Sequence, residues 1–548
     1  MSESQQTLPP GWVWATVEDL GEVTLGRQRS PRNHAGPYMR PYLRVANVFE
    51  NRIDTSDIME MNFDPGEFER FALAPGDVLL NEGQSLDLVG RPAMYRGEVP
   101  GACFTNTLVR FRPMPGVSPE FALAMFRHFL HTGKFQPIAR WTTNIAHLGA
   151  GRFAQMACPL APTAEQDRLT SELASYESRL DDAVATLKRV QQNLDRYRAS
   201  VLKAAVEGRL VPTEAELARR EGRDYEPASV LLERILDERR RRWIEDAAEK
   251  ARAKAEEKTR KAGKPWTPKD DTKTLEQERL KAAKKYKEPE PPDTSDLPDL
   301  QEGWCWATVA QLASGERHSL TDGPFGSNLK TEHYTAQGPR VVRLQNIGDG
   351  VFFDERAHIS REHYKHLLKH AVQAGDILIR SLGEEIPTAC LVPNWLGPAI
   401  VKADCLRFAP NPSVALAGYL MNALNSPPTR TRTESLIHGV GRPRVGLSLL
   451  RNLALPLPPL AEQRRVLEEI ERRLSVAAQV LATHDAQTGR LGRLRQSILK
   501  WAFEGRLVPQ DPNDEPASVL LERIQAERAK VAARPERDLR GRGTRRVS

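Results

Sequence analysis

The sequence predicts an α+β protein: two globular, mixed α/β domains separated by long antiparallel coiled-coil helices, with an internal pseudo-twofold repeat. Three observations lead to this prediction. Several phrases occur twice in the same order, an apolar seven-residue period follows each globular stretch, and the globular stretches alternate short apolar runs with Gly, Pro and Asn turns.

The repeat extends over most of the 548 residues. GWVWATVEDL at Gly11 returns as GWCWATVAQL at Gly303, and PLAPTAEQDRL at Pro159 returns as PLPPLAEQRRV at Pro456. RVANV also returns as RLQNI, PGDVLL parallels AGDILI, and VLKAAVEGRLVP returns as ILKWAFEGRLVP. Because the copies keep their order, the two halves are collinear and indicate a duplication.

The repeat divides the chain into six segments. They are globular domain 1 (1–160), helical region 1 (161–238), a charged helical arm and linker (239–298), globular domain 2 (299–458), helical region 2 (459–530) and a basic tail (531–548). We refer to the globular domains as head 1 and head 2. The dense charge of the arm and its Pro/Glu/Asp-rich end are typical of a solvated helical tether.

Each helical region begins after a Pro-rich stop, has AEQ in its first turn and carries a heptad seam. The seam consists of Leu169, Leu173, Tyr176, Leu180, Leu187 and Leu194 in region 1, and of Val466, Ile470, Leu491, Leu494 and Ile498 in region 2. The polar His484 and Gln487 interrupt the second seam. Since an apolar seam must be covered, we predict antiparallel pairing of the two helices within one molecule. Helices of about 45 residues would be roughly 65–70 Å long and would hold the heads apart.

The charge and cysteine content argue against a strongly basic protein, a disulfide-linked protein and a zinc protein. The chain has 79 Lys+Arg against 72 Asp+Glu, so a nucleic-acid surface would have to come from local clustering. Five cysteines without a C-x-x-C pair favour a reducing cytoplasm over a disulfide framework or a zinc site. The sequence has no signal-peptide pattern and no apolar stretch of about 18 residues. We therefore expect a cytoplasmic protein without a membrane partner.

No catalytic motif is present in the sequence. It lacks the Asn/Asp-Pro-Pro-aromatic run of amino-methyltransferases, a Gly-rich cofactor loop, a Walker A sequence and H-E-x-x-H. His363, His366 and His370 have helical spacing, but without nearby carboxylates or cysteines a polar helix surface is the better interpretation. We predict no catalytic residue and no metal site.

Both heads contain basic, amide-rich loops suited to DNA. Arg pairs with guanine, Asn or Gln pairs with adenine, and Gly-rich loops let the backbone approach phosphates. The DNA-binding candidates in head 1 are Arg27, Arg29, Arg32, Asn33, His34, Arg44, Asn47, Gln84, Ser85, Arg91 and Asn106. Those in head 2 are Ser327, Asn328, Lys330, Arg343, Gln345, Asn346, Arg380, Ser381, Arg442 and Arg444. Their recurrence at matched places favours DNA binding over merely soluble loops.

The ordered, duplicated set of motifs resembles the specificity (S, HsdS) subunit of type I restriction-modification systems over nearly the whole chain. The resemblance implies two target-recognition domains that each read one half of an asymmetric, bipartite site in double-stranded DNA. It implies a non-catalytic subunit that positions two modification (methyltransferase) subunits and two restriction (translocase/endonuclease) subunits. S-adenosylmethionine, ATP and magnesium would then bind to those partners and not to this chain.

Two other interpretations make different predictions. A coiled-coil scaffold with two protein-binding heads would lack DNA affinity that weakens steeply with salt. A self-sufficient modification enzyme would transfer methyl groups on its own, which the missing motifs argue against.

Overall fold

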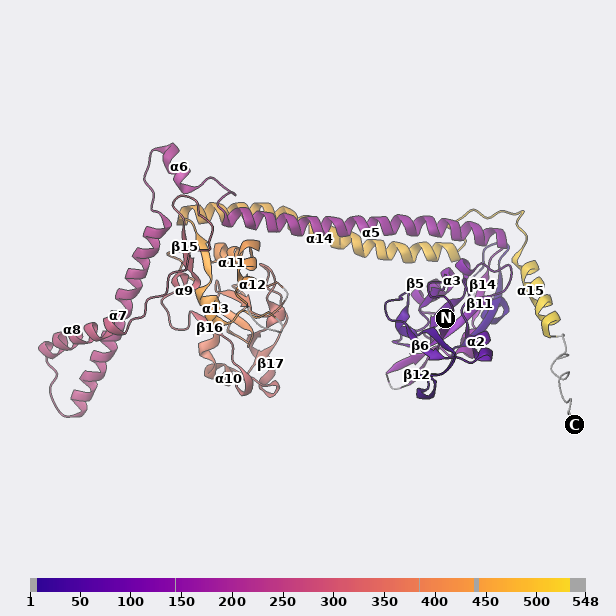
Figure 1. Cartoon of the computed structure of the whole chain (residues 1–548), viewed down its shortest axis with the longest axis horizontal. Helices are drawn as coiled ribbons and strands as arrows, with labels where there is room; N and C mark the ends of the chain where they lie inside the picture. Colours follow the sequence, from indigo (N-terminus) through magenta and orange to yellow (C-terminus); the bar gives the residue numbers. More distant parts are fainter. Residues whose placement is uncertain (1–6, 143, 384, 438–442, 533–548) are drawn as a thin grey trace. The chain divides into compact units, whose positions relative to one another are not determined.

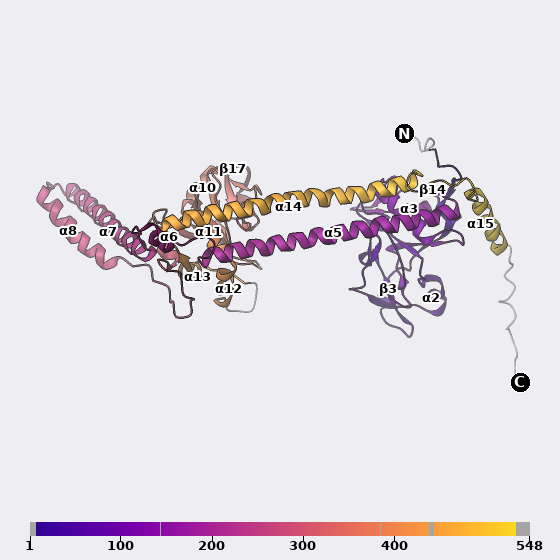
Figure 2. The ribbon, with the colours of Figure 1, turned by 90° about the horizontal axis from the view of Figure 1, so that it is seen from above.

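The fold combines mixed α/β heads with long helices, as the sequence predicted (Figures 1 and 2). The computed structural model describes residues 7–142, 144–383, 385–437 and 443–532. The chain forms two compact units, of which unit 1 comprises residues 1–189 and 484–548 and unit 2 comprises residues 190–483. Each unit therefore holds one head together with part of each long helix.

Head 1 is built from short strands and four helices. Its strands are β1 (Val13–Thr16), β2 (Gly21–Leu25), β3 (Met39–Leu43), β4 (Val48–Phe49), β5 (Arg52–Ile53), β6 (Met59–Asn62), β7 (Val78–Asn81), β8 (Gly83–Gln84), β9 (Pro92–Met94), β10 (Cys103–Phe104), β11 (Leu108–Pro113), β12 (Arg140–Thr142), β13 (Ile145–His147) and β14 (Ala157–Leu160). Its helices are α1 (Val17–Leu20), α2 (Pro65–Phe71), α3 (Pro119–His131) and α4 (Ala150–Ala154).

An antiparallel sheet in the order β2-β11-β7-β9 forms the centre of head 1. The aromatic face of α3 packs on it, with the rings of Phe111 and Phe126 5.1 Å apart. A second sheet, β10-β3-β6, contains the parallel pair β10–β3. Hairpin β12–β13 extends from β8, and β1 pairs with β14 where the chain enters and leaves the head.

Head 2 repeats the central sheet, the parallel strand pair and the closing strand pair of head 1, and its second sheet gains the strand β19 (Ala371–Val372). Its strands are β15 (Cys305–Thr308), β16 (Leu320–Asp322), β17 (Tyr334–Val342), β18 (His358–Ile359), β19 (Ala371–Val372), β20 (Ile377–Arg380), β21 (Thr388–Leu391), β22 (Ala399–Val401), β23 (Cys405–Phe408) and β24 (Ala454–Leu457). Its helices are α9 (Val309–Leu312), α10 (Arg361–His366), α11 (Ala417–Asn425), α12 (Pro427–Ser435) and α13 (Leu447–Asn452). Sheet β16-β23-β20-β21 matches the central sheet of head 1, β17–β22 is the parallel pair, and β15–β24 closes the head.

The long helices are α5 (Thr163–Val206) and α14 (Leu460–Phe503). In unit 1 the beginning of α5 shares a core with the end of α14, through Leu169 and Leu173 on one side and Ile498 on the other. In unit 2 the end of α5 shares a core with the beginning of α14, including Val466 and Ile470. The two helices therefore pair antiparallel within each unit.

The side chains of the predicted seam are buried near the ends of the long helices and are more exposed to solvent between them. Leu180 is buried, whereas Tyr176, Leu187, Leu194 and Leu491 are half-buried. Leu494 is 38% exposed, so its assignment to a buried seam is wrong. Ile498, the next predicted seam residue, is buried in the core that α14 shares with head 1 and α5.

The repeated EGRLVP phrase ends both long helices and packs on the opening of a head. Gly208 and Gly505 have φ values of +66° and +67°, and the next residue donates its N–H back to the last helical turn. A Cβ on Gly208 would lie 2.4 Å from the γ carbon of Gln301, and one on Gly505 would lie 2.5 Å from that of Pro9. Glycine is required by both the backbone conformation and the close approach.

The repeated EPASVLLERI phrase begins α7 (Ala228–Lys261) and α15 (Ala517–Ala532). The N–H of Ala228 donates to the carbonyl of Gly303, and the N–H of Ala517 donates to that of Gly11, each at 2.8 Å. Farther along the same helices, Arg239 donates to the carbonyls at the end of α9, and Arg528 donates to the carbonyl that follows α1. Both copies thus fold back onto the head in their own unit.

The repeated AEQ phrase fixes the start of each long helix to a head. The indole N–H of Trp12 donates to Glu165 at 2.9 Å, and that of Trp304 donates to Glu462 at 3.0 Å. The next residue in each copy, a buried Gln, accepts the backbone N–H at the start of α3 or α11. Burial raises the pKa of Glu165 and raises that of Glu462 to about 7.

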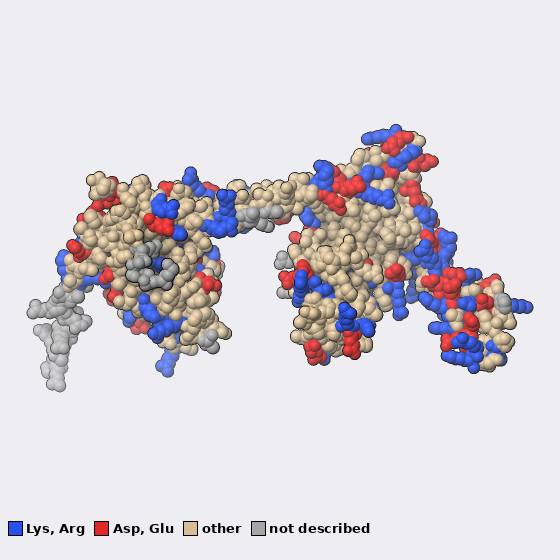
Figure 3. All heavy atoms as spheres, turned by 180° about the vertical axis from the view of Figure 1, so that it is seen from behind, with Lys and Arg blue, Asp and Glu red and all other residues tan. Residues whose placement is uncertain are grey.

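The charged arm is a helical hairpin in unit 2. After the short helix α6 (Glu214–Glu221), α7 continues well beyond head 2 and packs along α8 (Pro268–Lys285) (Figures 1 and 2). The break between the two helices lies at residues 262–267, which contain Gly263 and Pro265. Side chains of both charges cover this hairpin (Figure 3).

Replacing Gly505 with Ala is expected to lower the thermal unfolding midpoint of unit 1 by several degrees. The left-handed φ costs about 1 kcal/mol for Ala, and the new Cβ would collide with Pro9. Gly492→Ala is the matched control, because this helical glycine in α14 has open space around it and Ala is the better helix former by about 1 kcal/mol. Equal midpoints for the two variants in differential scanning calorimetry would contradict this account.

Glu462 is expected to make unit 2 less stable as the pH rises. A carboxyl with a folded pKa of about 7 binds a proton more tightly in the folded chain than in the unfolded chain, where its pKa is about 4.3. Its stabilisation is complete below the unfolded pKa and is lost as the pH rises through about 7. Glu462→Gln should flatten the fall in unfolding midpoint between pH 5 and pH 8. Glu469→Gln in the same helix should retain it, because hydrogen bonds from Arg472 and Arg473 lower the pKa of the Glu469 carboxyl to about 2, below this pH range. An unchanged slope in Glu462→Gln would rule out this role.

Candidate nucleic-acid interface

The same four segments meet in each head beyond the central sheet. In head 1, Gly26 lies against the backbone of Thr105, and a Cβ there would be 2.2 Å from the carbonyl oxygen. Gln84 in β8 pairs with Ala146 in hairpin β12–β13. In head 2, Gly323 lies equally close to the backbone of Lys402.

The fourth segment of head 2 reaches the group through a bridge between Leu382 and Arg444. This bridge takes the place of the β8–β13 pairing in head 1. In head 1, the sheets bring together the loops after β2, after β7, before β11 and before α4. In head 2, the equivalent loops follow β16 and β20 and precede β23 and α13. We call these four segments of each head its loop cluster.

Several candidates in head 1 present polar side chains on the surface of its loop cluster. Arg29, Arg32, His34 and Ser85 are exposed, and Asn33 is half-buried. The guanidinium of Arg29 lies 5.7 Å from the centre of the Tyr42 ring. Within the described ranges, neither Arg29 nor Arg32 has an ion-pair partner. These arginines keep their hydrogen-bond donors available for a ligand.

Gln84 and Asn106 are half-buried members of the same cluster. The amide oxygen of Gln84 accepts the N–H of Ser85 at 3.2 Å. The backbone N–H of Asn106 donates to the carbonyl of Arg27 at 2.9 Å. Asn106 thus lies beside the loop after β2, which carries Arg29 and Arg32 and is called the arginine loop below.

Three arginines of head 1 are committed to contacts within the protein. Arg27 forms an ion pair with Glu67 at 2.7 Å and a hydrogen bond to the carbonyl of Asn62. Arg44 pairs with Asp57. The side chain of Arg91 donates to a carbonyl at 2.7 Å and lies over the ring of Phe49, where burial lowers its pKa. Each helps to hold a loop in place.

Asn47 and Asn346 were predicted to bind DNA, and the structure corrects this. Both are buried, at 2% and 1% exposure. Each accepts the backbone N–H three residues earlier and donates its amide to two backbone carbonyls, at 2.7–3.0 Å. The shared Asn of RVANV and RLQNI therefore closes a turn in each head and has no free edge for a base.

Head 2 exposes its own set of candidates. Ser327, Asn328, Lys330 and Gln345 are exposed. Gln345 and Arg380 line one open hollow together with Leu344, Leu382, Gly383 and Glu385. This hollow lies between the turn after β17, which carries Gln345, and the loop after β20 in the loop cluster. An amide and a guanidinium from different segments can therefore act on the same ligand.

Other head 2 candidates are tied to the protein or lie elsewhere. Arg444 pairs with Asp404 at 2.7 Å and lies 5.6 Å from the centre of the exposed Phe325 ring. Arg343 is half-buried, and its backbone N–H caps the turn closed by the buried Asn. The assignment of Ser381 is wrong, because it is 1% exposed and its hydroxyl donates to the carbonyl of Asp404. Arg442 lies outside the described residues.

Sequence reasoning missed the hairpin β12–β13. Arg140, Trp141 and Thr142 are exposed there, with Trp141 57% exposed and Ile145 48% exposed. The signal in the sequence was an aromatic and basic pair directly before a polar turn, RWTTN. In duplex DNA, exposed apolar side chains can contact thymine methyl groups, and neighbouring basic side chains can contact phosphates.

The histidines do not form a metal face. The Nε2 of His363 lies 2.9 Å from the carbonyl oxygen of Asn328, and its ring stacks on His333. His366 ends the short helix α10, and His370 is buried beside the carbonyl of Asp322, with its pKa lowered by burial. Among the described residues no group of three or more His, Cys, Asp or Glu could hold a metal ion.

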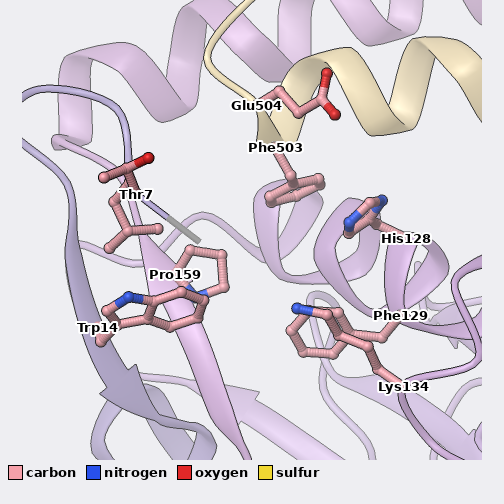
Figure 4. A pocket seen from close by; sticks show the side chains of 9 residues that line it. Thr7, Trp14, His128, Phe129, Lys134, Pro159, Phe503 and Glu504 are labelled. Carbon is pink, nitrogen blue, oxygen red and sulfur yellow. The ribbon is translucent and has the colours of Figure 1, made fainter. Parts of the chain in front are cut away.

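A pocket in unit 1 lies at the junction of head 1 with the end of α14, away from the loop cluster (Figure 4). Its walls include Trp14, Phe129 and Phe503, and the Lys134 ammonium lies over the first two rings at 5.8 and 5.0 Å. Burial lowers the pKa of His128 to about 4, so this ring is neutral where it stacks on Phe503. These contacts join helix and head.

A search of the described helices finds none with the length and apolar character needed to cross a membrane.

Two heads of one topology, each carrying a loop cluster and each attached to paired long helices, define a duplicated two-headed protein. No protein-family model matches the chain. It is similar to the type I restriction enzyme EcoBI specificity subunit of Escherichia coli, with 24% identity over 397 residues, 71% of this chain and 68% of the relative. It is also similar to the EcoKI specificity subunit of Escherichia coli strain K12, with 21% identity over 541 residues, 95% of this chain and 96% of the relative.

A solved structure from work on complex assembly and conformational transition of the type I R-M system has the same fold. It superposes with a TM-score of 0.57 at 15% identity, covering 91% of this chain and all of the other. The resemblance drawn from the sequence is confirmed: the chain is a relative of type I specificity subunits. Both of these relatives are named as specificity subunits of type I restriction enzymes.

Asn47→Ala and Arg32→Ala are expected to separate stability from ligand binding in head 1. The first change leaves an N–H and two carbonyls without their partner, which costs about 2–3 kcal/mol and lowers the unfolding midpoint by several degrees. The second removes an exposed side chain and should leave the midpoint unchanged while weakening DNA binding. Thermal unfolding and fluorescence anisotropy with duplex DNA measure both effects. A stable Asn47→Ala protein with impaired DNA binding would restore the original assignment.

Proposed function

We propose that this chain is the DNA sequence-recognition subunit of a type I restriction-modification complex. The observation that supports it most directly is the pair of heads, which share one topology yet present different side chains on equivalent loop clusters. Exposed Arg, Asn and Gln side chains provide the paired donors and acceptors that distinguish base pairs in the major groove. The full-length similarity to a specificity subunit is consistent with this role.

Each head would read one half of a bipartite site. Head 1 would use its arginine loop, including Arg29 and Arg32, together with the exposed hairpin β12–β13. Head 2 would use the hollow lined by Gln345 and Arg380. Because the two clusters differ in almost every exposed residue, the two half-sites would differ and the whole site would be asymmetric.

The chain itself would position chemistry that other subunits perform. Two modification subunits would supply adenine methylation from S-adenosylmethionine, and two restriction subunits would supply ATP- and magnesium-dependent translocation and cleavage. Each unit joins the long helices to a head through the same three contacts, from AEQ, EGRLVP and EPASVLLERI. These matched junctions would offer the two modification subunits equivalent surfaces in the cytoplasm.

Replacing residues 1–158 with the corresponding head of a relative is expected to change one half of the methylated motif and to leave the other half intact. Each head has its own core and its own loop cluster, so the second half-site should be unaffected. The measurement is sequencing of the methylated genome of a strain that carries the partner subunits, with this gene present, deleted or exchanged.

Three results of this experiment are decisive. Loss of one split, adenine-methylated motif on deletion supports the function, and a half-changed motif in the chimera supports the assignment of one head to each half. A chimera that alters both halves would refute modular reading. An unchanged methylome after deletion, with active partner subunits, would contradict the function and favour a scaffold with protein-binding heads.

A further inference from the structure

The helical hairpin of the arm, residues 239–285, is strongly basic. Residues 239–285 contain 17 Lys and Arg against 9 Asp and Glu, an excess of 8, whereas the full chain has an excess of 7. The rest of the chain is thus almost neutral. The C-terminal residues 531–548 are a second basic stretch, with 6 Arg against 2 Asp and Glu. A local basic excess on a helical element indicates an electrostatic role for that element.

The arm is a defined structural element. Ala248 on α7 and Ala282 on α8 are buried between the helices, and small side chains let the two backbones approach closely. The rings of Trp243 and Tyr286 lie 5.3 Å apart at the base of the hairpin. Arg252–Asp271 and Arg279–Glu245 ion pairs tie the two helices together, at 2.7 and 2.5 Å. The hairpin therefore holds its surface charges in fixed positions.

Most acidic residues of the hairpin are already paired, whereas most lysines are not. Ion pairs within the hairpin involve Glu245, Glu256, Glu257, Asp271 and Glu278. Asp270 caps the start of α8. The lysines that are exposed and make no ion pair within the described ranges are Lys250, Lys254, Lys258, Lys264, Lys269, Lys273, Lys284 and Lys285.

Three of these lysines form a stripe on α7. Lys250, Lys254 and Lys258 follow each other at intervals of four residues, so they share one face and are spaced about 6 Å apart along the axis. Like charges at this spacing destabilise an isolated helix by a few tenths of a kcal/mol per pair. A polyanion bound along the stripe would neutralise these charges and remove the repulsion between the lysines.

We propose that this lysine stripe binds the sugar-phosphate backbone of duplex DNA flanking the half-site read by head 2. The inference rests on the proposed function and adds a sequence-independent contact to it. Lysine is a point charge that suits phosphates without reading bases. Each neutralised phosphate releases condensed counterions, which gives affinity at low salt.

Protein surfaces fit this stripe less well than DNA. Lysine is depleted in protein–protein interfaces, whose affinity depends on large buried anchors. Residues 250–261 contain only Ala, Thr, Glu, Lys and Arg, so the stripe offers no such anchor. An acidic partner protein is the alternative that the experiment below can detect.

The test compares the full-length chain with a variant carrying Lys250→Gln, Lys254→Gln and Lys258→Gln. Two duplexes contain the same target site, and only one continues for about two helical turns beyond the half-site of head 2. With the long duplex, the variant should bind several-fold more weakly at low salt. The slope of log K against log [salt] should become shallower by about 2–3, since each phosphate that is no longer neutralised reduces it by about 0.9. With the short duplex, the variant should match the parent.

The matched control changes Asp246→Asn, Glu249→Gln and Glu276→Gln, which are exposed acidic residues of the same hairpin. This variant should bind the long duplex at least as tightly as the parent. Circular dichroism of both variants should show unchanged helix content, because Gln is a good helix former and Asn has nearly the same helix propensity as the Asp that it replaces.

Each other outcome overturns the inference in its own way. Equal affinity and slope for parent and lysine variant on the long duplex would show that the stripe does not touch DNA. If the lysine variant bound both duplexes equally more weakly than the parent, the stripe would act on the half-site itself and not on the flanking DNA. Weakening seen only when modification subunits are added would identify an acidic partner protein. A parent chain that binds neither duplex in a salt-dependent manner would contradict the proposed function together with this extension.

Discussion

The architecture depends on a buried hydrogen bond between a tryptophan and a glutamate, made once in each unit. Trp12 donates to Glu165, and Trp304 donates to Glu462. Each bond joins the opening segment of a head to the first turn of the helix that leaves it. Burying a carboxyl is costly unless it is hydrogen-bonded. A head that moved away from its helix would remove one of the two hydrogen bonds to this group and leave only the one from Gln510 or from the backbone N–H of Glu214. The raised pKa of both carboxyls reflects that environment.

Further contacts close each head onto the helices from the other side. The glycine after α14 packs against the opening segment of head 1, and the glycine after α5 packs against the opening segment of head 2. The helices that follow, α15 and α7, each donate their first N–H to the carbonyl of the glycine that begins GWVW or GWCW. Three phrases that lie far apart in sequence thus meet at one place in each unit. Their repetition has an intramolecular cause, independent of any partner that also binds there.

This arrangement lets the loop clusters vary while the junctions stay the same. The strands that carry the loops are fixed by their pairing and by apolar cores that do not include the exposed loop residues. Asn47 and Asn346 are examples of constant scaffold positions next to variable loops, because they close the same turn in each head beside loops of different composition. A scaffold of this kind can present new recognition residues without a new fold, which suits a subunit that selects DNA sequences.

The sequence alone determined the duplication, the α+β class, the long helices and the phrases that begin and end them. These features are encoded locally, by repeats, heptad spacing, capping residues and glycines. The sequence could not determine which polar loop side chains are exposed to solvent and which are held by contacts within the protein. Arg29 and Arg27 are two positions apart in one loop, yet one is exposed and the other is paired with Glu67. Ser381, Asn47 and Asn346 look like ligands in sequence and are buried, whereas Trp141 was overlooked and is exposed. Only tertiary structure decides this, because the partners of a side chain come from segments distant in sequence, and burial depends on all of them together.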